Sequence, residues 1–369
     1  MQYYKHLDGI RAIAVLLVYL LHANAAYMPS GQMGVTLFFV LSGFLISLKI
    51  FRPEPFNYYL FIEKRIKRIL PAFFAVLIIS LILSIWLLDD YERKINTEIG
   101  LFSLLISANF YLNWFGSLDI TVVPLLHYWS LSVEEQFYFI VIPALYLIYK
   151  LVNQKLFFLL VLLLTIISFS LSFYFLINQD LYSAYYPTYS RLGELLVGVI
   201  GAQLKNLNLV SKLKSDTLNL ISTCSFGFIV IGAISINASI YPALSASIIS
   251  IATIAIILND RPYCINKLLA NKSISYFGKI SYSFYLIHAA LLVFYRKFFE
   301  IPILNFSHVL IVFVVSLILS HFSYQYIEEK FRYREFHFKH TLLYYLVIPA
   351  AITLAIIGYI LFKVRHLYL

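Results

Sequence analysis

Long apolar runs recur along the whole of this sequence, and no long polar stretch separates them. A helix needs about 20 apolar residues to cross the hydrocarbon core of a bilayer, and these runs have that length. The composition agrees, because 61% of the residues are hydrophobic, 12% are charged and the mean hydropathy is +0.83. The sequence therefore predicts an all-α, polytopic transmembrane helical bundle and excludes a separate soluble domain.

The lengths of the runs predict about eleven transmembrane helices. We expect them near residues 10–27, 33–50, 69–88, 122–149, 156–177, 190–204, 217–236, 240–258, 280–298, 308–327 and 341–362. The stretch 99–115 is apolar and aromatic but short, so we expect it to form an interfacial or re-entrant piece rather than a full crossing.

The basic residues predict the orientation of the bundle. If the N-terminus is cytoplasmic, 21 of the 28 Lys and Arg residues fall in internal segments, as the positive-inside rule requires. We therefore expect a cytoplasmic N-terminus and an extracytoplasmic C-terminus, and we interpret the net charge of +10 as a sign of topology rather than of nucleic-acid binding. The two cysteines are too few for a disulfide framework and have no metal-binding spacing.

The N-terminal segment has an alternative interpretation. Its basic start, the apolar residues 12–21 and the tripeptide at 23–25 also resemble a cleavable signal peptide. Three ionisable residues argue against this interpretation: Asp8 in the basic region, and Arg11 and His22 at the two ends of the apolar stretch. They favour a membrane-embedded helix that carries functional polar groups.

Ionisable residues at membrane depth are costly and are therefore functional candidates. Arg11 and His22 are separated by eleven residues, which is about three full helical turns, so they share a face about 16 Å apart along the axis. Together with Asp8, they predict a line of polar residues along one helix face. Arg11 would bind an anion at the cytoplasmic end of this line, and His22 would accept a proton deeper in the membrane. The alternatives are a snorkelling arginine and a core histidine that is hydrogen-bonded to a neighbouring helix.

A basic segment precedes the third predicted span. Arg65 and Arg68 are i, i+3 neighbours, as a clamp for phosphate groups would need. The alternative is that these basic residues only mark the cytoplasmic side of the membrane or contact anionic lipid. In the second predicted span, Ser42 precedes Gly43, and a glycine there permits close approach of a helix or a ligand.

Three further clusters carry polar groups into the predicted bundle. His127 and Glu134 are seven residues apart and share a helix face, with Trp129 between them in sequence. Arg191 and Glu194 form an i, i+3 pair, for which a structural ion pair is the alternative to a binding role. Tyr282 and His288 lie in the ninth predicted span, where packing is the alternative.

Six of these motifs occur in an order that resembles the membrane-bound acyltransferase family 3. The match covers roughly residues 3–335 and rests on LDGIRA at 7–12 with the Arg11-x10-His22 pair, FFVLSGF at 38–44, RIKRILP at 65–71, WSLSVEEQFY at 129–138, RLGE at 191–194 and ISYSFYL at 280–286. Each motif alone is weak, whereas six in the right order are specific. The family comprises integral-membrane O-acyltransferases that modify lipopolysaccharide O-antigens and other cell-surface glycans.

The resemblance implies a fold, a reaction and a location. It implies an acyltransferase-3 transmembrane domain at 1–340, with 341–369 as an additional C-terminal helix of the same bundle. It implies acetyl-CoA as the cytoplasmic acyl donor, a lipid-linked or surface glycan as the acceptor, and no metal. It also implies a multi-pass protein in contact with the lipids of the bacterial cytoplasmic (inner) membrane. Many relatives append an SGNH-type esterase domain, and since this sequence ends at Leu369, we expect a separate periplasmic partner protein to supply any such activity.

The resemblance and the residue pattern together assign roles to the candidates. We expect His22 as the general base, with Glu134 and Arg11 in the catalytic set. We expect the donor to be bound by Arg65, Arg68, Arg11, Ser42 and Gly43, and the acceptor by Asp8, His127, Trp129, Arg191, Glu194, Tyr282 and His288.

Three alternatives remain open from the sequence, the third being that the protein is a non-enzymatic structural partner of a glycan-assembly complex. In the first, His22 or Ser42 carries the acyl group transiently before transfer. In the second, the protein is a proton-coupled transporter or flippase of a glycan-assembly pathway, since such carriers also bury charge pairs and histidines.

Overall fold

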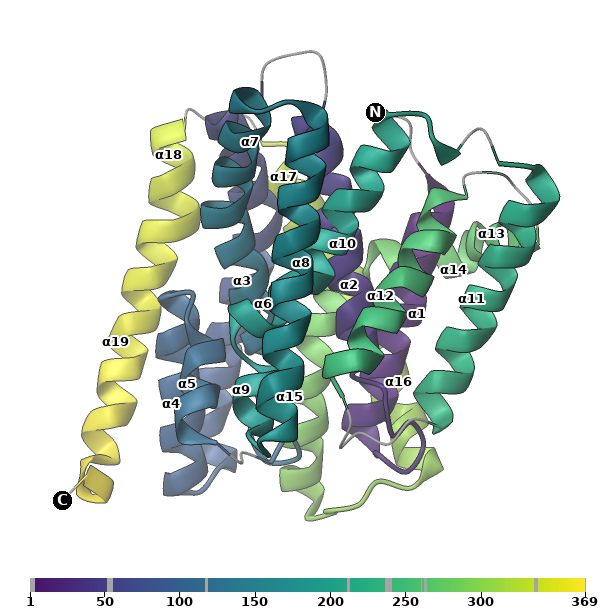
Figure 1. Ribbon diagram of the computed structural model, residues 1–369. Coiled ribbons are helices and arrows are strands. Elements are labelled where there is room, and N and C mark those ends of the chain that lie inside the picture. Colours follow the sequence, from purple (N-terminus) through teal and green to yellow (C-terminus); the bar gives the residue numbers. More distant parts are fainter. Residues whose placement is uncertain are drawn as a thin grey trace. The chain divides into compact units, whose positions relative to one another are not determined.

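The computed structural model describes residues 4–51, 56–116, 119–210, 213–235, 241–259, 261, 264–334 and 338–368. Every regular element within these residues is a helix (Figure 1). By its contacts the chain divides into two compact units. Unit 1 comprises Met1–Leu21, Ala25–Phe56 and Val133–Ser281, and unit 2 comprises His22–Asn24, Asn57–Ser132 and Tyr282–Leu369.

Unit 1 is built around two helices that touch along their length, α2 (Met33–Ile50) and α10 (Thr188–Asn206). Both contact α12 (Ala243–Leu258), and α8 (Gln154–Ile177) packs on α10 and α12. The unit also contains most of α1 (Lys5–Ala23), the end of α6 (Tyr128–Gln136), the π-helix η1 (Phe137–Val141), α7 (Ile142–Leu151), α9 (Leu181–Tyr185), α11 (Ser215–Ser235), α13 (Cys264–Leu269) and α14 (Lys272–Lys279).

Glycines permit the close approach of α2 and α10. A Cβ atom on Gly43 would lie 1.9 Å from the carbonyl oxygen of Leu195, and one on Gly198 would lie 2.3 Å from that of Val40. No side chain fits at such distances, so the two backbones pack directly against each other, as small residues allow in membrane helices.

Unit 2 is built around α3 (Tyr58–Leu87), along which the C-terminal helix α19 (Ile348–Lys363) packs together with α4 (Asp90–Leu104) (Figure 1). The remaining elements are α5 (Ala108–Phe115), the start of α6, α15 (Ser281–Phe299) from Tyr282 onward, α16 (Phe306–Ser323), η4 (Tyr324–Glu329), α17 (Lys330–Arg332), α18 (Phe338–Leu342), η5 (Leu343–Val347) and η6 (Arg365–Tyr368).

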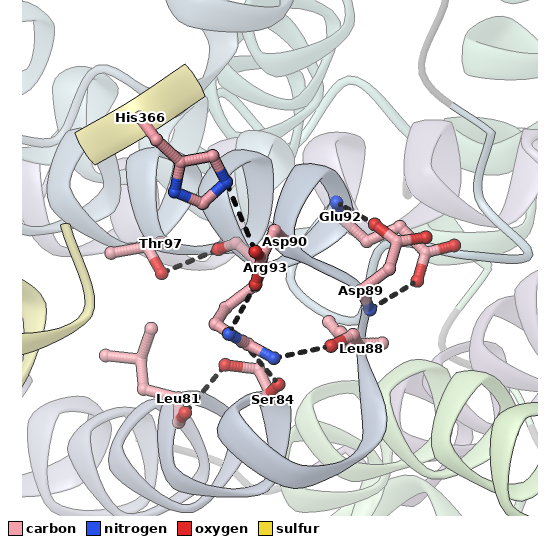
Figure 2. Close-up of polar contacts among 9 residues, drawn as sticks. All are labelled: Leu81, Ser84, Leu88, Asp89, Asp90, Glu92, Arg93, Thr97 and His366. Carbon is pink, nitrogen blue, oxygen red and sulfur yellow. Dashed lines mark hydrogen bonds and ion pairs between the residues drawn. The ribbon is translucent and has the colours of Figure 1, made fainter. Parts of the chain in front are cut away.

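A polar cluster fixes the turn from α3 to α4 (Figure 2). Asp89 caps α4 in a capping box, in which its side chain accepts from the amide of Glu92 at 2.8 Å and Glu92 accepts in return from the amide of Asp89. The guanidinium of Arg93 donates to the carbonyl oxygens of Ser84 at 3.2 Å and Leu88 at 2.8 Å. The end of one helix is thus tied to the beginning of the next.

Each of the eleven predicted ranges overlaps a helix. Within the described residues, eight helices are long and apolar enough to cross a membrane: Lys5–Ala23, Met33–Ile50, Tyr58–Leu87, Tyr128–Leu151, Gln154–Ile177, Ser215–Ser235, Phe306–Arg332 and Phe338–Lys363. A ninth results if the bent pair α14 and α15 is one span. The two other predicted spans coincide with α10, which carries charged residues, and α12, which has 16 residues. The number eleven and the orientation of the termini therefore stay predictions.

The stretch 99–115 forms no long helix. It lies in α4 and α5, two helices that are separated by a break at residues 105–107, where Ile106 has a φ of 55°. This agrees with the prediction that these residues do not form a full crossing.

Candidate active site

His22 lies in the last turn of α1 and belongs to unit 2, where it meets His288 of α15. Nδ1 of His22 is 3.0 Å from Nε2 of His288, so the two rings share a hydrogen bond. The ring planes differ by 17° and the centroids are 5.1 Å apart. Because stacked rings cannot bring two atoms as close as 3.0 Å, the imidazoles meet edge to edge. His22 keeps 7% of its surface exposed and His288 none.

Arg296, also on α15, holds the backbone of His22. One guanidinium nitrogen, Nη2, donates to the carbonyl oxygens of His22 at 2.8 Å and of Ala23 at 2.7 Å. Carbonyl groups at a helix C-terminus have no partner within the helix, and a cation there complements the helix dipole. The next residue, Lys297, forms an ion pair with Glu92. One helix therefore holds His22 at both its ring and its backbone.

His127, in the segment before α6, belongs to the same cluster. Its Nε2 is 3.2 Å from the carbonyl oxygen of Leu286, and its ring centroid is 5.8 Å from that of His288. The hydroxyl of Tyr285 donates to the carbonyl oxygen of His127 at 3.1 Å and is 2.6 Å from Oγ of Ser130. Although three histidines gather here, no group of His, Cys, Asp or Glu side chains in the described part of the chain could hold a metal ion.

Arg65 and Arg68 lie near the beginning of α3 in unit 2, and both are partly buried. Arg68 is close enough to Glu328 of η4 for the two charges to interact. Lys67 between them pairs with Glu63 at 2.6 Å. The two arginines thus share one basic segment in which Lys67 is already neutralised.

Glu328 was not predicted as a site residue. It is 4% exposed and accepts a hydrogen bond of 2.5 Å from the hydroxyl of Ser283, on α15. Tyr282, next to Ser283, donates from its hydroxyl to the carbonyl oxygen of Ile69 at 3.0 Å. Tyr282 therefore joins α15 to the basic segment of α3, within unit 2.

The first cluster of the sequence is divided between the two units. In unit 1, Nη1 of Arg11 pairs with Oδ1 of Asp8 at 2.6 Å, and their side chains are 21% and 4% exposed. His22 lies in the last turn of the same helix but in unit 2. Ser42 is partly buried in α2, and Gly43 contacts the backbone of α10.

Glu134 and Trp129 both lie on α6, but in different units. Glu134 is partly buried in unit 1, where it accepts a hydrogen bond of 2.6 Å from the hydroxyl of Tyr138, one turn further on at the start of a π-helix. Trp129 is 5% exposed in unit 2. The hydrogen bond from Tyr138 was not predicted, although its spacing of four residues from Glu134 is the signal that could have revealed it.

Arg191 and Glu194 form a sealed ion pair on α10 in unit 1. Nη2 of Arg191 is 3.0 Å from Oε1 of Glu194, and the side chains are 0% and 1% exposed. The guanidinium lies against the rings of Tyr185 and Tyr241, with 5.0 and 5.3 Å to their centroids. Burial raises the pKa of the Tyr185 phenol to about 12, so this phenol is neutral at physiological pH. The pair has no surface to offer a ligand in this conformation, which favours the structural alternative.

The predicted residues are divided between the two units. Unit 2 holds His22, His127, Trp129, His288, Arg65, Arg68 and Tyr282, and unit 1 holds Asp8, Arg11, Ser42, Gly43, Glu134, Arg191 and Glu194. The residues that sequence reasoning missed are Arg296, Tyr285, Ser130 and Glu328. Arg296 lies about two helical turns after His288, and this spacing is the one signal that could have connected it with the site.

Comparisons with known proteins show similarity to acyltransferases. The profile of a family described as an acyltransferase domain, acyltransferase 3, matches residues 4–325. Two proteins named O-acetyltransferase OatA, from Staphylococcus aureus strains NCTC 8325 / PS 47 and COL, are 31% identical over 372 residues, which cover 91% of this chain and 58% of theirs. Another protein of strain COL, by name a candidate O-acetyltransferase, is 31% identical over 359 residues, 90% of this chain and 58% of its own.

The chain thus spans 58% of the length of the curated relatives it matches. No solved structure is a significant match.

Proposed function

The chain belongs to the acyltransferase 3 family, and from that premise we propose that it is a multi-pass membrane O-acetyltransferase. In this proposal it transfers an acetyl group from cytoplasmic acetyl-CoA to a hydroxyl of a cell-surface glycan such as lipopolysaccharide O-antigen, in the bacterial inner membrane. A separate SGNH-type protein is the partner that we propose for any further transfer. The names of the relatives and the helices of spanning length support the proposal.

The arrangement of His22 is the observation that carries the proposal. A general base works best when another group orients it, and His22 is held at its ring by His288 and at its backbone by Arg296. His22 is 7% exposed, whereas its partner His288 is 0% exposed.

The reaction is the attack of a hydroxyl on a thioester. The hydroxyl oxygen bonds to the thioester carbonyl carbon, and its proton passes to His22. The C–S bond then breaks, and the CoA sulfur leaves and takes the proton from His22. The products are the acetyl ester and free CoA.

The donor would be bound through its phosphates. Guanidinium groups bind phosphate oxygens in pairs of charge-assisted hydrogen bonds, and Arg65 and Arg68 are three residues apart on α3. We propose His127, Trp129 and Tyr282 on the acceptor side.

The test is transfer of labelled acetyl from acetyl-CoA to a glycan by the purified full chain. We expect His22→Ala to abolish transfer while the protein stays in the membrane, because a base contributes about 10²–10⁴-fold to such a rate. We expect Arg65→Ala and Arg68→Ala to raise the KM for acetyl-CoA with little change in kcat. Near-normal transfer by His22→Ala would remove His22 from the mechanism, and an unchanged KM would remove the two arginines from the donor site.

A further inference from the structure

The hydrogen bonds of His288 determine which of its nitrogens carries the proton. Nδ1 of His288 is 2.9 Å from the carbonyl oxygen of Phe284. A carbonyl oxygen can only accept, so Nδ1 of His288 must donate and must carry a hydrogen. In a neutral imidazole with this hydrogen, Nε2 has only a lone pair and can only accept.

The same argument continues from His288 to His22. Nε2 of His288 is 3.0 Å from Nδ1 of His22, and since it can only accept, Nδ1 of His22 must be the donor. Neutral His22 is then left with a bare lone pair on Nε2. Within the described part of the chain, no group hydrogen-bonds to Nε2 of His22. The nitrogen that can take a proton therefore has no hydrogen-bond partner among the described residues.

The surroundings favour the neutral form of His288. The titratable and charged groups that face the pair are His127 from the segment before α6, and Tyr285 and Arg296 from α15. His288 is 0% exposed, and placing a cation there would cost desolvation energy.

We propose that His288 is a positioning residue that holds His22 in the Nδ1–H tautomer. This inference rests on the proposed function, in which His22 is the base. When Nε2 of His22 takes the proton of the acceptor hydroxyl, the ring becomes a cation whose Nδ1–H still donates to Nε2 of His288. A carboxylate has this role beside the histidine of serine proteases. Here a neutral imidazole takes the role and is itself fixed by the carbonyl oxygen of Phe284.

The opposite tautomer would not support the reaction. With the proton on Nε2, His22 would present a donor to the incoming hydroxyl, and its only lone pair would lie on Nδ1, against His288. A hydroxyl that must lose a proton cannot give it to Nε2 of His22 in this tautomer, because that nitrogen already carries one. The orientation of His22 is therefore as important as its presence.

The direct test is ¹⁵N NMR of the full-length, histidine-labelled protein in detergent or nanodiscs, without substrate. The ¹⁵N shifts distinguish a protonated from a bare ring nitrogen, and comparison with His22→Gln assigns the His22 signals. We expect Nδ1 to be protonated and Nε2 to be bare in the wild type. A proton on Nε2 of His22 would overturn the inference, whatever the enzyme's activity.

Variants at His288 supply the kinetic test. His288→Met fills the space without an acceptor, and we expect kcat to fall by about 10²-fold with an unchanged KM for acetyl-CoA. His288→Gln restores an acceptor oxygen near the position of Nε2, and we expect it to recover kcat to within about 10-fold of the wild type. His321→Met is the matched control, because His321 is an exposed histidine of α16.

The outcomes separate this inference from the proposed function. Wild-type kcat in His288→Met, or equal losses of kcat in folded His288→Met and His288→Gln, would overturn the positioning role. Full activity of His22→Ala would instead contradict the proposed base, and the tautomer measured in the wild type would still stand as a property of the fold.

Discussion

Arg296 holds the backbone of His22, and we expect this contact to affect the rate of the proposed reaction. Its two hydrogen bonds to the carbonyl oxygens of His22 and Ala23 are charge-assisted, and bonds of this kind contribute about 1.5–3 kcal/mol each. We expect Arg296→Met to let the end of α1 move and to lower kcat by about 10-fold or more, measured as acetyl transfer at saturating acetyl-CoA. Arg296→Lys should recover only part of the rate, because one ammonium group cannot reproduce the guanidinium geometry.

Lys297→Met is the matched control for Arg296→Met. It removes the same charge at the neighbouring position, but Lys297 pairs with Glu92 rather than with the backbone of His22. We expect a smaller loss of kcat in this variant. If both variants lost the same activity, the position of His22 would depend on general packing of α15 and not on Arg296.

The ion pair of Arg191 and Glu194 gives a prediction about stability. Removal of one partner of a fully buried pair leaves an uncompensated charge and costs about 3–5 kcal/mol. We expect Arg191→Met to lower the melting temperature sharply, and Arg191→Met with Glu194→Gln to recover most of it, measured by thermal unfolding in detergent. The folded double variant also tests the predicted role in acceptor binding, since a raised KM for the glycan would support that role.

At the scale of elements, the contact of α2 with α10 explains why this pair of helices forms the centre of unit 1. A Cβ at position 43 would lie 1.9 Å from the carbonyl oxygen of Leu195, so the helices would have to separate. We expect Gly43→Ala to lower the free energy of unfolding by about 1–3 kcal/mol, as overpacking does. Circular dichroism during thermal unfolding is a suitable measurement.

The chain offers controls for that substitution in other helices. Gly227 on α11 and Gly358 on α19 have no atom within 4 Å of an added Cβ. Gly227→Ala and Gly358→Ala should be neutral or stabilise the protein by up to about 1 kcal/mol, because alanine is the better helix former. Equal effects at all three positions would show that helix propensity, and not the contact with Leu195, determines the result.

At the scale of the whole molecule, the lengths of the apolar runs predicted where helices form. This succeeds because a backbone in lipid must satisfy its hydrogen bonds within its own helix. The breaks were harder to predict. The bend between α14 and α15 follows Gly278, whose added Cβ would lie 1.7 Å from the carbonyl oxygen of Asp8, and nothing in the local sequence reveals such a distant contact.

The candidate site was predictable in its ionisable residues but not in their partners. His22 and His288 could be singled out because burying an imidazole is costly. Their mutual hydrogen bond joins two residues that are 266 positions apart in the chain, and no periodicity encodes such a contact. Arg296 was missed because an arginine beside Lys297 at the end of a span resembles an ordinary interfacial anchor.

The orientation of the whole chain in the membrane is a prediction from its charges, and helix α8 is where it can be tested. Lys155 lies at the predicted cytoplasmic end of α8 and Asn178 at the predicted outer end, and both are exposed. In a chain with Cys224→Ser and Cys264→Ser, we expect Asn178→Cys to react with a membrane-impermeant maleimide from the periplasmic side of cells. We expect Lys155→Cys to react only after the inner membrane is opened. The reverse pattern would place the N-terminus outside, and then Arg65 and Arg68 could not meet a cytoplasmic donor.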